Sequence, residues 1–104
     1  MKVLLDECVP RPLQKALSNH QFFTVDDLGW KGVKNGALVA QAAGQFDSLI
    51  TADKNLRYQQ NLSEREIAIL ELPTPYWPTL RRYVVEIQRA LDALKPNEYV
   101  TLTF

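Results

Sequence analysis

Short apolar runs alternate with helical patterns along this chain, and this alternation constrains the fold more than any other feature. The first run is apolar from Val3 to Leu5, as in a parallel strand that is covered on both faces. The runs expected to be strands are KVLL at 2–5, FFTV at 22–25, SLIT at 48–51, IAILEL at 67–72 and the terminal EYVTLTF, the last at a sheet edge. The sequence therefore predicts an α/β fold, a compact three-layer α/β/α sandwich with a mostly parallel sheet.

Helical signals occupy the segments between these runs. Pro10 and Pro12 suit the first turn of a helix that continues to about Leu17. Asn35 is expected to cap a helix that extends to about Ala43. The longest helix is expected after a proline-rich break, because apolar residues recur there at helical spacing. They are Leu80, Tyr83, Val84, Ile87, Leu91 and Leu94.

Composition limits the classes of protein that the chain can represent. Its 104 residues suit one domain, 1–104, and 46% of them are hydrophobic, which is enough for a core. The 12 basic and 12 acidic side chains cancel, so the chain as a whole does not attract nucleic acid. A single cysteine favours a reducing compartment. With neither an apolar span of about 20 residues nor a secretion signal, we expect a cytoplasmic protein that does not enter a membrane.

Acidic side chains follow each of the first three predicted strands. Asp6 and Glu7 come directly after the first strand, Asp26 and Asp27 after the second, and Asp53 after the third. In an open parallel sheet, ligands bind beyond the carboxyl ends of the strands, where the strand order reverses. If the second and third strands flank the first, Asp6 and Asp53 end neighbouring strands at that point.

A divalent cation would explain why carboxylates gather there. Adjacent carboxylates repel one another unless something neutralises them. Mg²⁺ and Mn²⁺ prefer oxygen ligands, often need only one or two carboxylates plus a substrate phosphate, and activate water for displacement at phosphorus. Asp6, Glu7 and Asp53 are therefore predicted metal ligands, and Asp6 and Asp53 are also predicted catalytic residues. Taken singly, each acid is better explained in another way, Asp6 as a helix cap, Asp53 as a turn residue and Asp26–Asp27 as solvated side chains, and only their combination favours a metal site.

Two stretches carry a family resemblance. LLDECVP and NGALVAQAAGQFDSLITADKNLRYQQNL resemble the PIN-like proteins of the DUF5615 type, compact relatives of PIN-domain nucleases. The most specific parts are DE after the first strand and TADKN after the third, and the resemblance extends over nearly the whole chain. It implies a Rossmann-like fold, RNA cleavage with Mg²⁺ or Mn²⁺, and a toxin that pairs with a small antitoxin protein. Asp6 and Asp53 match the family's acids, and Glu7 matches the acid that often accompanies the first.

One departure from the family pattern leaves alternatives open. PIN nucleases usually carry a further carboxylate in or before the helix that precedes the third strand, and here VKNGALVAQ has none. One alternative is that Asp26 or Asp27 replaces this carboxylate, and the others are a weakened metal site and a catalytically disabled interaction module. A receiver-type domain with Asp53 as phosphoacceptor is a third alternative. It is disfavoured because only residues 54–66 precede the fourth strand and no lysine follows the last one.

Basic and aromatic side chains near the predicted acidic site favour an RNA partner. Positive charge around an acidic pocket guides a polyanion to it, and an aromatic ring stacks on an unpaired base. The predicted nucleic-acid-binding residues are Trp30, Lys31, Lys34, Lys54 and Arg57, with Arg11 nearby. The alternative for Trp30 is packing against its own domain.

The remaining polar signals are less specific. The amides of 58–61 either hold a ligand or connect their own loop. Cys8 is expected to be a small buried residue, because the only histidine, His20, lies beyond the far end of the first helix and cannot pair with it. The apolar stripe on the last helix predicts either a homodimer contact or a core face.

Overall fold

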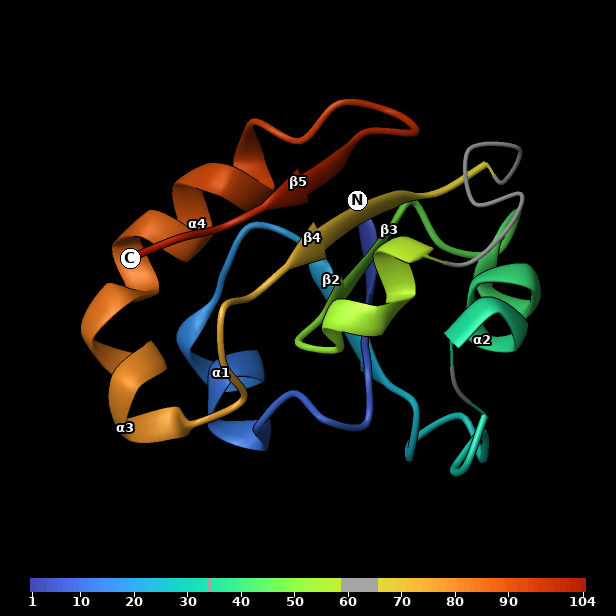
Figure 1. The fold of residues 1–104 in the computed structure, drawn as a ribbon, viewed down its shortest axis with the longest axis horizontal. Helices are drawn as coiled ribbons and strands as arrows, with labels where there is room; N and C mark the ends of the chain where they lie inside the picture. Colours follow the sequence, from blue (N-terminus) through green and yellow to red (C-terminus); the bar gives the residue numbers. More distant parts are fainter. Residues whose placement is uncertain (34, 59–65) are drawn as a thin grey trace.

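A five-stranded parallel sheet forms the centre of the protein (Figure 1). The computed structural model describes residues 1–33, 35–58 and 66–104. The strands are β1 (Lys2–Leu5), β2 (Gln21–Thr24), β3 (Ser48–Thr51), β4 (Ala68–Glu71) and β5 (Tyr99–Thr101). Their spatial order is β2-β1-β3-β4-β5, and every neighbouring pair is parallel. The predicted strands are confirmed, and the terminal strand lies at a sheet edge.

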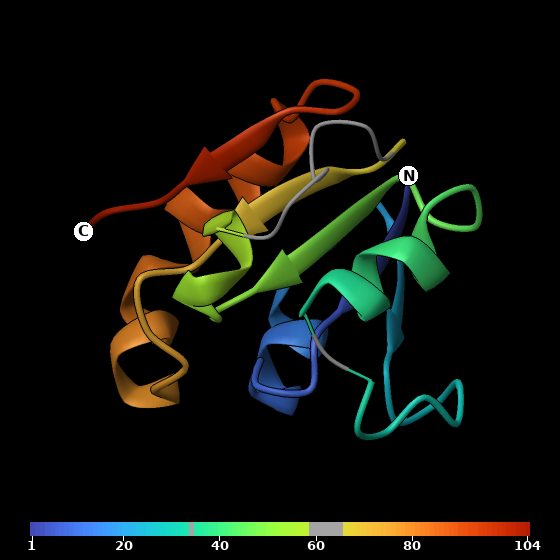
Figure 2. The ribbon, with the colours of Figure 1, turned by 45° about the vertical axis from the view of Figure 1, so that its right-hand side comes forward.

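Helices cover both faces of this sheet. They are α1 (Arg11–Ala16), α2 (Asn35–Ala42), the 3-10 helix η1 (Lys54–Tyr58), α3 (Trp77–Leu80), the 3-10 helix η3 (Arg81–Tyr83) and α4 (Val84–Asp92). Figure 2 shows α2 and η1 on one face and α1, α3 and α4 on the other. The predicted three-layer α/β/α sandwich is confirmed.

Strand side chains alternate between two hydrophobic cores. On β1, Val3 and Leu5 pack with the layer of α1, α3 and α4, whereas Leu4 packs with the layer of α2 and η1. These side chains are at most 1% exposed, which explains why the first strand is apolar at consecutive positions. The same alternation places Leu49 of β3 on the α2 face and Ile50 on the α1 face. The central strands β1, β3 and β4 are therefore buried on both faces.

The longest predicted helix is divided in the structure. Residues 77–92 form α3, η3 and α4 in succession, because the backbone of Tyr83 leaves the helical region with φ −124° and ψ 24°. The ring of Tyr83 stacks on Phe104, 4.2 Å between centroids, a long-range contact that periodicity does not encode. The predicted stripe still faces inward, since Leu80, Ile87 and Leu91 have no exposed surface. A homodimer contact elsewhere stays a prediction.

Candidate functional site at the carboxyl edge of the sheet

Asp6 is held in one orientation at the end of β1. Its side chain is buried, with 8% of the residue exposed. Oδ1 accepts the N–H of Glu7 at 2.7 Å, and Oδ2 accepts the hydroxyl of Thr51 at 2.7 Å. The backbone N–H of Asp6 donates to the carbonyl of Ile50 at 2.9 Å, which continues the ladder with β3. Oδ2 also accepts a weak hydrogen bond from Cys8 Sγ at 3.7 Å, and Oδ1 keeps a further lone pair that can accept a ligand.

Asp53 follows β3 and opens η1. Its Oδ1 accepts the N–H of Asn55 at 3.0 Å, and its carbonyl accepts the N–H of Leu56 at 3.2 Å. Its own N–H donates to Thr51 Oγ1 at 3.0 Å. The buried hydroxyl of Thr51 therefore donates to Asp6 and accepts from the backbone of Asp53, so that it fixes both acids relative to β3.

The acids of the first and third strands share one hollow. Asp6, Glu7, Cys8 and Asp53 line a space of about 400 Å³. It lies where β1 is flanked by β2 on one side and β3 on the other, the point at which open parallel sheets bind ligands. The predicted neighbourhood of Asp6 and Asp53 is confirmed. Glu7 is exposed, and its Oε1 accepts the N–H of Gly32 at 3.3 Å, which draws this carboxylate toward the β2–α2 loop.

Cys8 lines this hollow and is an exposed residue, so the prediction of a small buried residue is wrong. Its Sγ lies 3.7 Å from Asp6 Oδ2 and 3.9 Å from Thr51 Oγ1, and it accepts the N–H of Ala52 at 3.4 Å. Burial of the sulfur raises the pKa of the Cys8 thiol, and the adjacent negative charge of Asp6 raises it further. The group is therefore a thiol near neutral pH, and not an activated nucleophile.

The donor set suits a hard cation that is held by few protein ligands. Within residues 1–33, 35–58 and 66–104, no group of three or more His, Cys, Asp or Glu side chains converges closely enough to hold a metal ion. The carboxylates of Asp6 and Asp53 nevertheless face one hollow. Mg²⁺ commonly retains several waters and uses one or two carboxylates together with substrate phosphate. The residues present fit that mode of binding better than a complete protein cage.

Predicted basic residues lie beside the acids. Lys31 and Arg11 line a second hollow of about 220 Å³ together with Asp6 and Asp26. Arg11 Nη2 is 2.6 Å from Asp26 Oδ2, an exposed ion pair that engages the acid after β2. The predicted proximity of Lys31 and Arg11 to the acidic site is confirmed. Lys34 lies outside the described residues.

Arg57, one of the predicted RNA-binding residues, is bonded to a buried carboxylate that the sequence analysis did not single out. Glu71, at the end of β4, has no exposed surface, and its two oxygens accept Nε–H and Nη2–H from Arg57. The hydroxyl of Tyr99 also donates to Glu71 Oε1, at 2.6 Å. Desolvation and the neighbouring carboxylate raise the pKa of this tyrosine. The signal was a lone acid inside the apolar run IAILEL, where only a paired carboxylate is tolerated.

Trp30 packs inside the domain instead of extending from it. The indole is half-buried, and it meets the ring of Phe46 edge-on with 6.0 Å between centroids. This is the packing alternative that the sequence left open. Lys54 is exposed on η1. Of the polar stretch 58–61, only Tyr58 lies among the described residues, and its side chain is exposed.

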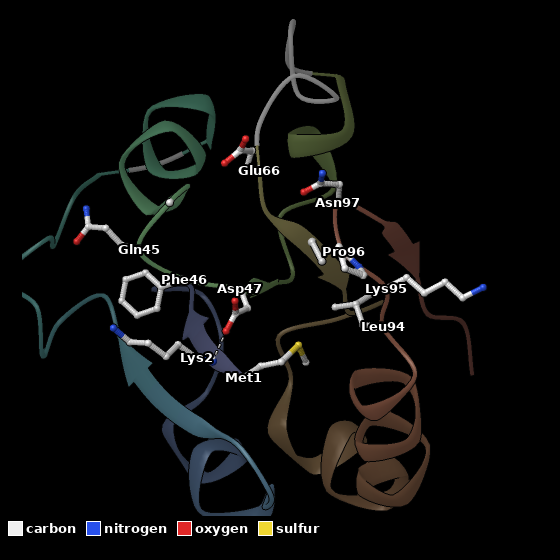
Figure 3. A pocket seen from close by; sticks show the side chains of 12 residues that line it. Met1, Lys2, Gln45, Phe46, Asp47, Glu66, Leu94, Lys95, Pro96 and Asn97 are labelled. Atoms are coloured by element: carbon white, nitrogen blue, oxygen red, sulfur yellow. Dashed lines mark hydrogen bonds between the residues drawn. The ribbon is translucent and has the colours of Figure 1, made fainter.

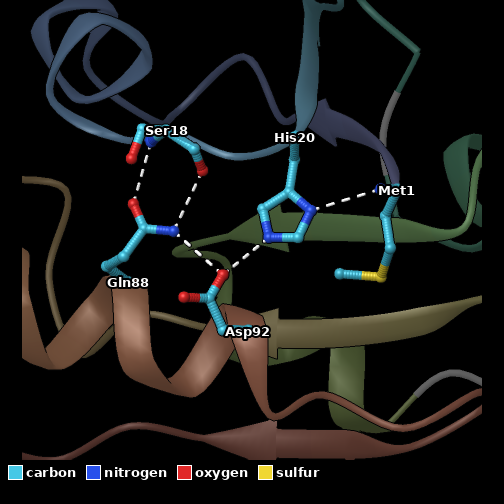
Figure 4. A network of polar contacts seen from close by, with 5 residues as sticks. All are labelled: Met1, Ser18, His20, Gln88 and Asp92. Carbon is cyan, nitrogen blue, oxygen red and sulfur yellow. Dashed lines mark hydrogen bonds and ion pairs between the residues drawn. The ribbon is translucent and has the colours of Figure 1, made fainter.

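The opposite edge of the sheet is also hollowed, and several of its polar groups bond to one another. A space of about 440 Å³ lies at the amino ends of the strands. Figure 3 shows the side chains that line it. There the N–H of Lys2 donates to Asp47 at 2.8 Å, and its Nζ lies 5.3 Å from the centre of the Phe46 ring. His20 belongs to the same edge, with Nε2 2.7 Å from Asp92 Oδ1 (Figure 4). It is remote from Cys8, as expected.

Comparison with known proteins identifies the family. A family model described as a PIN like domain matches residues 1–70, which include β1, β3 and the acids at their ends. The chain therefore belongs to the PIN-like domain family, and the DUF5615 type stays a resemblance. No curated protein and no solved structure matched the chain. Among the described residues, no helix is long and apolar enough to cross a bilayer.

Proposed function

We propose that this PIN-like protein is a divalent-metal-dependent ribonuclease. The observation that carries the proposal is the common hollow of Asp6 and Asp53, whose carboxylates end two adjacent parallel strands. The family commonly comprises nucleases, and the match spans both acids. The strand order is also that of flavodoxin-like folds, so the fold alone does not exclude a receiver-type domain, and the family match favours the nuclease class.

In the proposed mechanism, the chain's own residues position the reacting groups. Asp6 and Asp53 would hold the cation, and Mg²⁺ or Mn²⁺ bound there would activate water and stabilise negative charge at phosphorus. Glu7 would join them only by leaving the N–H of Gly32, which its Oε1 accepts. Thr51 keeps the Asp6 carboxylate directed into the hollow, because its hydroxyl bonds Oδ2 at 2.7 Å. Lys31 adds positive charge beside the acids, which favours a polyanionic substrate.

A cleavage assay tests this proposal. Asp6→Asn and Asp53→Asn keep the side-chain shape and remove the charge, so each lowers Mn²⁺-dependent cleavage of single-stranded RNA by about a thousandfold, equivalent to several kcal/mol of lost stabilisation. Asp47→Asn is the matched control, because Asp47 accepts a backbone N–H at the amino edge. Full cleavage by either Asp6→Asn or Asp53→Asn, with Asp47→Asn equally active, contradicts the mechanism.

A disabled interaction module is the second candidate function. Two observations favour it: α2 carries no acid, and no three metal-ligating side chains converge within the described residues. An acidic hollow that binds no cation would then be a remnant of a nuclease site. The assay separates the two candidates, because the module shows no metal-dependent cleavage even in the wild type.

The cellular setting belongs to the proposal as well. We propose that the protein acts in the cytoplasm as the toxin of a toxin–antitoxin pair. Its partners would be RNA and a small antitoxin protein that blocks the acidic hollow. A homodimer is a further prediction. Co-expression with a neighbouring small open reading frame, followed by growth measurements, tests the toxin role.

A further inference from the structure

The 3-10 helix η1 presents a combination of side chains that suits single-stranded RNA. It begins directly after Asp53, so it belongs to the same segment as a proposed catalytic residue. Tyr58 at its end is 76% exposed, the largest value among the large hydrophobic residues of the described chain. Lys54 is exposed on the same short helix. Exposed aromatic rings next to cations are the usual platform for unpaired bases and their phosphates.

The side chain of Arg57, next to Tyr58, is already fixed in one orientation before any RNA binds. Its side chain is 38% exposed while that of its partner Glu71 is fully buried, so the guanidinium lies at the boundary between core and solvent. The bonds to Glu71 use Nε and Nη2, and the hydroxyl of Tyr99 donates to Glu71 Oε1, the oxygen that also accepts Arg57 Nε–H. The N–H groups of Nη1 take no part in this pair. An arginine fixed in this way loses little entropy when it binds a phosphate.

The anchor of Arg57 lies within reach of the acidic hollow. Glu71 is the register partner of Thr51 across β3 and β4, and the Thr51 hydroxyl is bonded to Asp6. Glu71 and Asp6 are thus two strand spacings apart along the carboxyl edge, about 10 Å. An RNA strand with one phosphate at Asp6 would therefore bring a neighbouring phosphate close to Arg57.

Tyr58 takes the role that the sequence suggested for Trp30. The indole of Trp30 is packed edge-on against Phe46 and is only partly accessible. Stacking on it would require the indole to leave its core contact. Tyr58, by contrast, offers a largely uncovered ring without any rearrangement of the core.

We infer that η1 is a docking element for single-stranded RNA, in which Tyr58 stacks on an unpaired base and Arg57 binds a backbone phosphate. Glu71 and Tyr99 are positioning residues that hold the guanidinium toward the strand. This inference rests on the proposed function, because it names the substrate contact of the same site. It concerns binding, so it is measured separately from cleavage.

Tyrosine variants test the stacking contact. Binding of a fluorescent single-stranded RNA oligonucleotide is followed by anisotropy in EDTA, which prevents metal-dependent cleavage. Tyr58→Ala weakens affinity about tenfold, within the usual range for a lost base stack, and Tyr58→Phe restores it. Tyr76→Ala is the matched control, since Tyr76 is 63% exposed but precedes α3 on the other face of the sheet. Equal affinities of wild type and Tyr58→Ala overturn the inference.

The phosphate contact is tested by the salt dependence of the same binding. Arg57→Gln alone strands a buried carboxylate and is prone to unfold, so the test variant is Arg57→Gln with Glu71→Gln, whose two amides can pair. Its slope of log affinity against log salt is smaller than in the wild type by about 0.7, the value of one phosphate contact on a single strand. Arg89→Gln, an exposed arginine on α4, keeps the full slope. An unchanged slope in the double variant overturns the arginine contact.

The inference and the proposed function fail in different ways. If the wild type binds RNA through Tyr58 and Arg57 but does not cleave it with Mn²⁺, the ribonuclease proposal is wrong and the docking element stands. If cleavage depends on Asp6 while RNA affinity is indifferent to both η1 residues, the docking element is wrong and the nuclease stands. No RNA binding by the wild type overturns the docking element.

Discussion

The two ends of β3 each carry a buried hydroxyl group, and within the described part of the chain only one of the two is hydrogen-bonded. Ser48 begins the strand and Thr51 ends it, and neither residue has any exposed surface. Thr51 donates to Asp6 and accepts from Asp53, whereas Ser48 Oγ has no hydrogen-bond partner within the described ranges. The hollows at the amino edge are at least as large as that at the carboxyl edge. A connected network of buried polar groups, and not the size of a cavity, therefore distinguishes the candidate site.

Exchanging each hydroxyl for an apolar group sharpens this comparison. Thr51→Val leaves the N–H of Asp53 without its partner and Asp6 Oδ2 with only the weak bond from Cys8, so it lowers the free energy of unfolding by about 1–3 kcal/mol. Ser48→Ala removes an unpaired hydroxyl, and its effect is neutral or slightly stabilising, within about 1 kcal/mol. Urea unfolding of the two variants beside the wild type provides the measurement. A larger loss for Ser48→Ala than for Thr51→Val would break the comparison.

The reactivity of Cys8 reports on the charge of its neighbour. Burial and the Asp6 carboxylate both raise the pKa of the thiol, so we expect slow alkylation by iodoacetamide near neutral pH. Asp6→Asn removes the charge and lowers that pKa, which makes alkylation several-fold faster. Asp47→Asn, at the other edge of the sheet, leaves the rate unchanged. Mass spectrometry of timed samples gives the rates, and identical rates in wild type and Asp6→Asn would show that the thiol and the carboxylate are not coupled.

The network at the amino edge supports stability instead of chemistry, and its effect is the smallest. Bonds from His20 and then Gln88 hold the pKa of Asp92 below its ordinary value of 3.8 (Figure 4). A depressed pKa in the folded state stabilises the protein above the unfolded pKa, and this contribution is lost as the pH falls through the folded value. Asp92→Asn therefore lowers the urea midpoint slightly at pH 7, and the gap to the wild type narrows in acid.

A gap that widens below pH 3.8, the ordinary value for this carboxyl, would contradict the sign of that shift. RNA cleavage by Asp92→Asn is expected to equal that of the wild type, because Asp92 lies at the end of α4 at the amino edge. Reduced cleavage with normal stability would instead show that the Asp92 network at the amino edge influences the acidic hollow at the carboxyl edge.

Sequence patterns predicted most of the fold because the central strands β1, β3 and β4 are buried on both faces. Consecutive apolar residues such as Val3, Leu4 and Leu5 leave few alternatives to a parallel strand in the centre of a sheet. The division of the last helix was not predictable, since it accompanies the stacking of Tyr83 on Phe104, a contact between distant parts of the chain. Periodicity describes one element at a time and does not register such contacts.

The site was predicted in part for the same reason. Asp6 and Asp53 follow two neighbouring strands, and parallel strands bring their carboxyl ends to one edge of the sheet. Their proximity was therefore predictable from their positions in the sequence. The roles of Thr51 and Glu71 depend on which face of the sheet their side chains occupy and on what bonds them there. Arg57 was predicted from its charge alone, and its fixed orientation emerges only from the partner on β4.

Calorimetric titration with Mn²⁺ tests the central claim most directly, because metal binding does not require the correct RNA. Wild type, Asp53→Asn and the control Asp47→Asn are titrated under identical conditions. The proposed site predicts that wild type and Asp47→Asn bind the ion and that Asp53→Asn does not. Equal Mn²⁺ binding by all three proteins, or none by the wild type in the presence of a non-cleavable RNA analogue, would contradict a metal centre at Asp6 and Asp53.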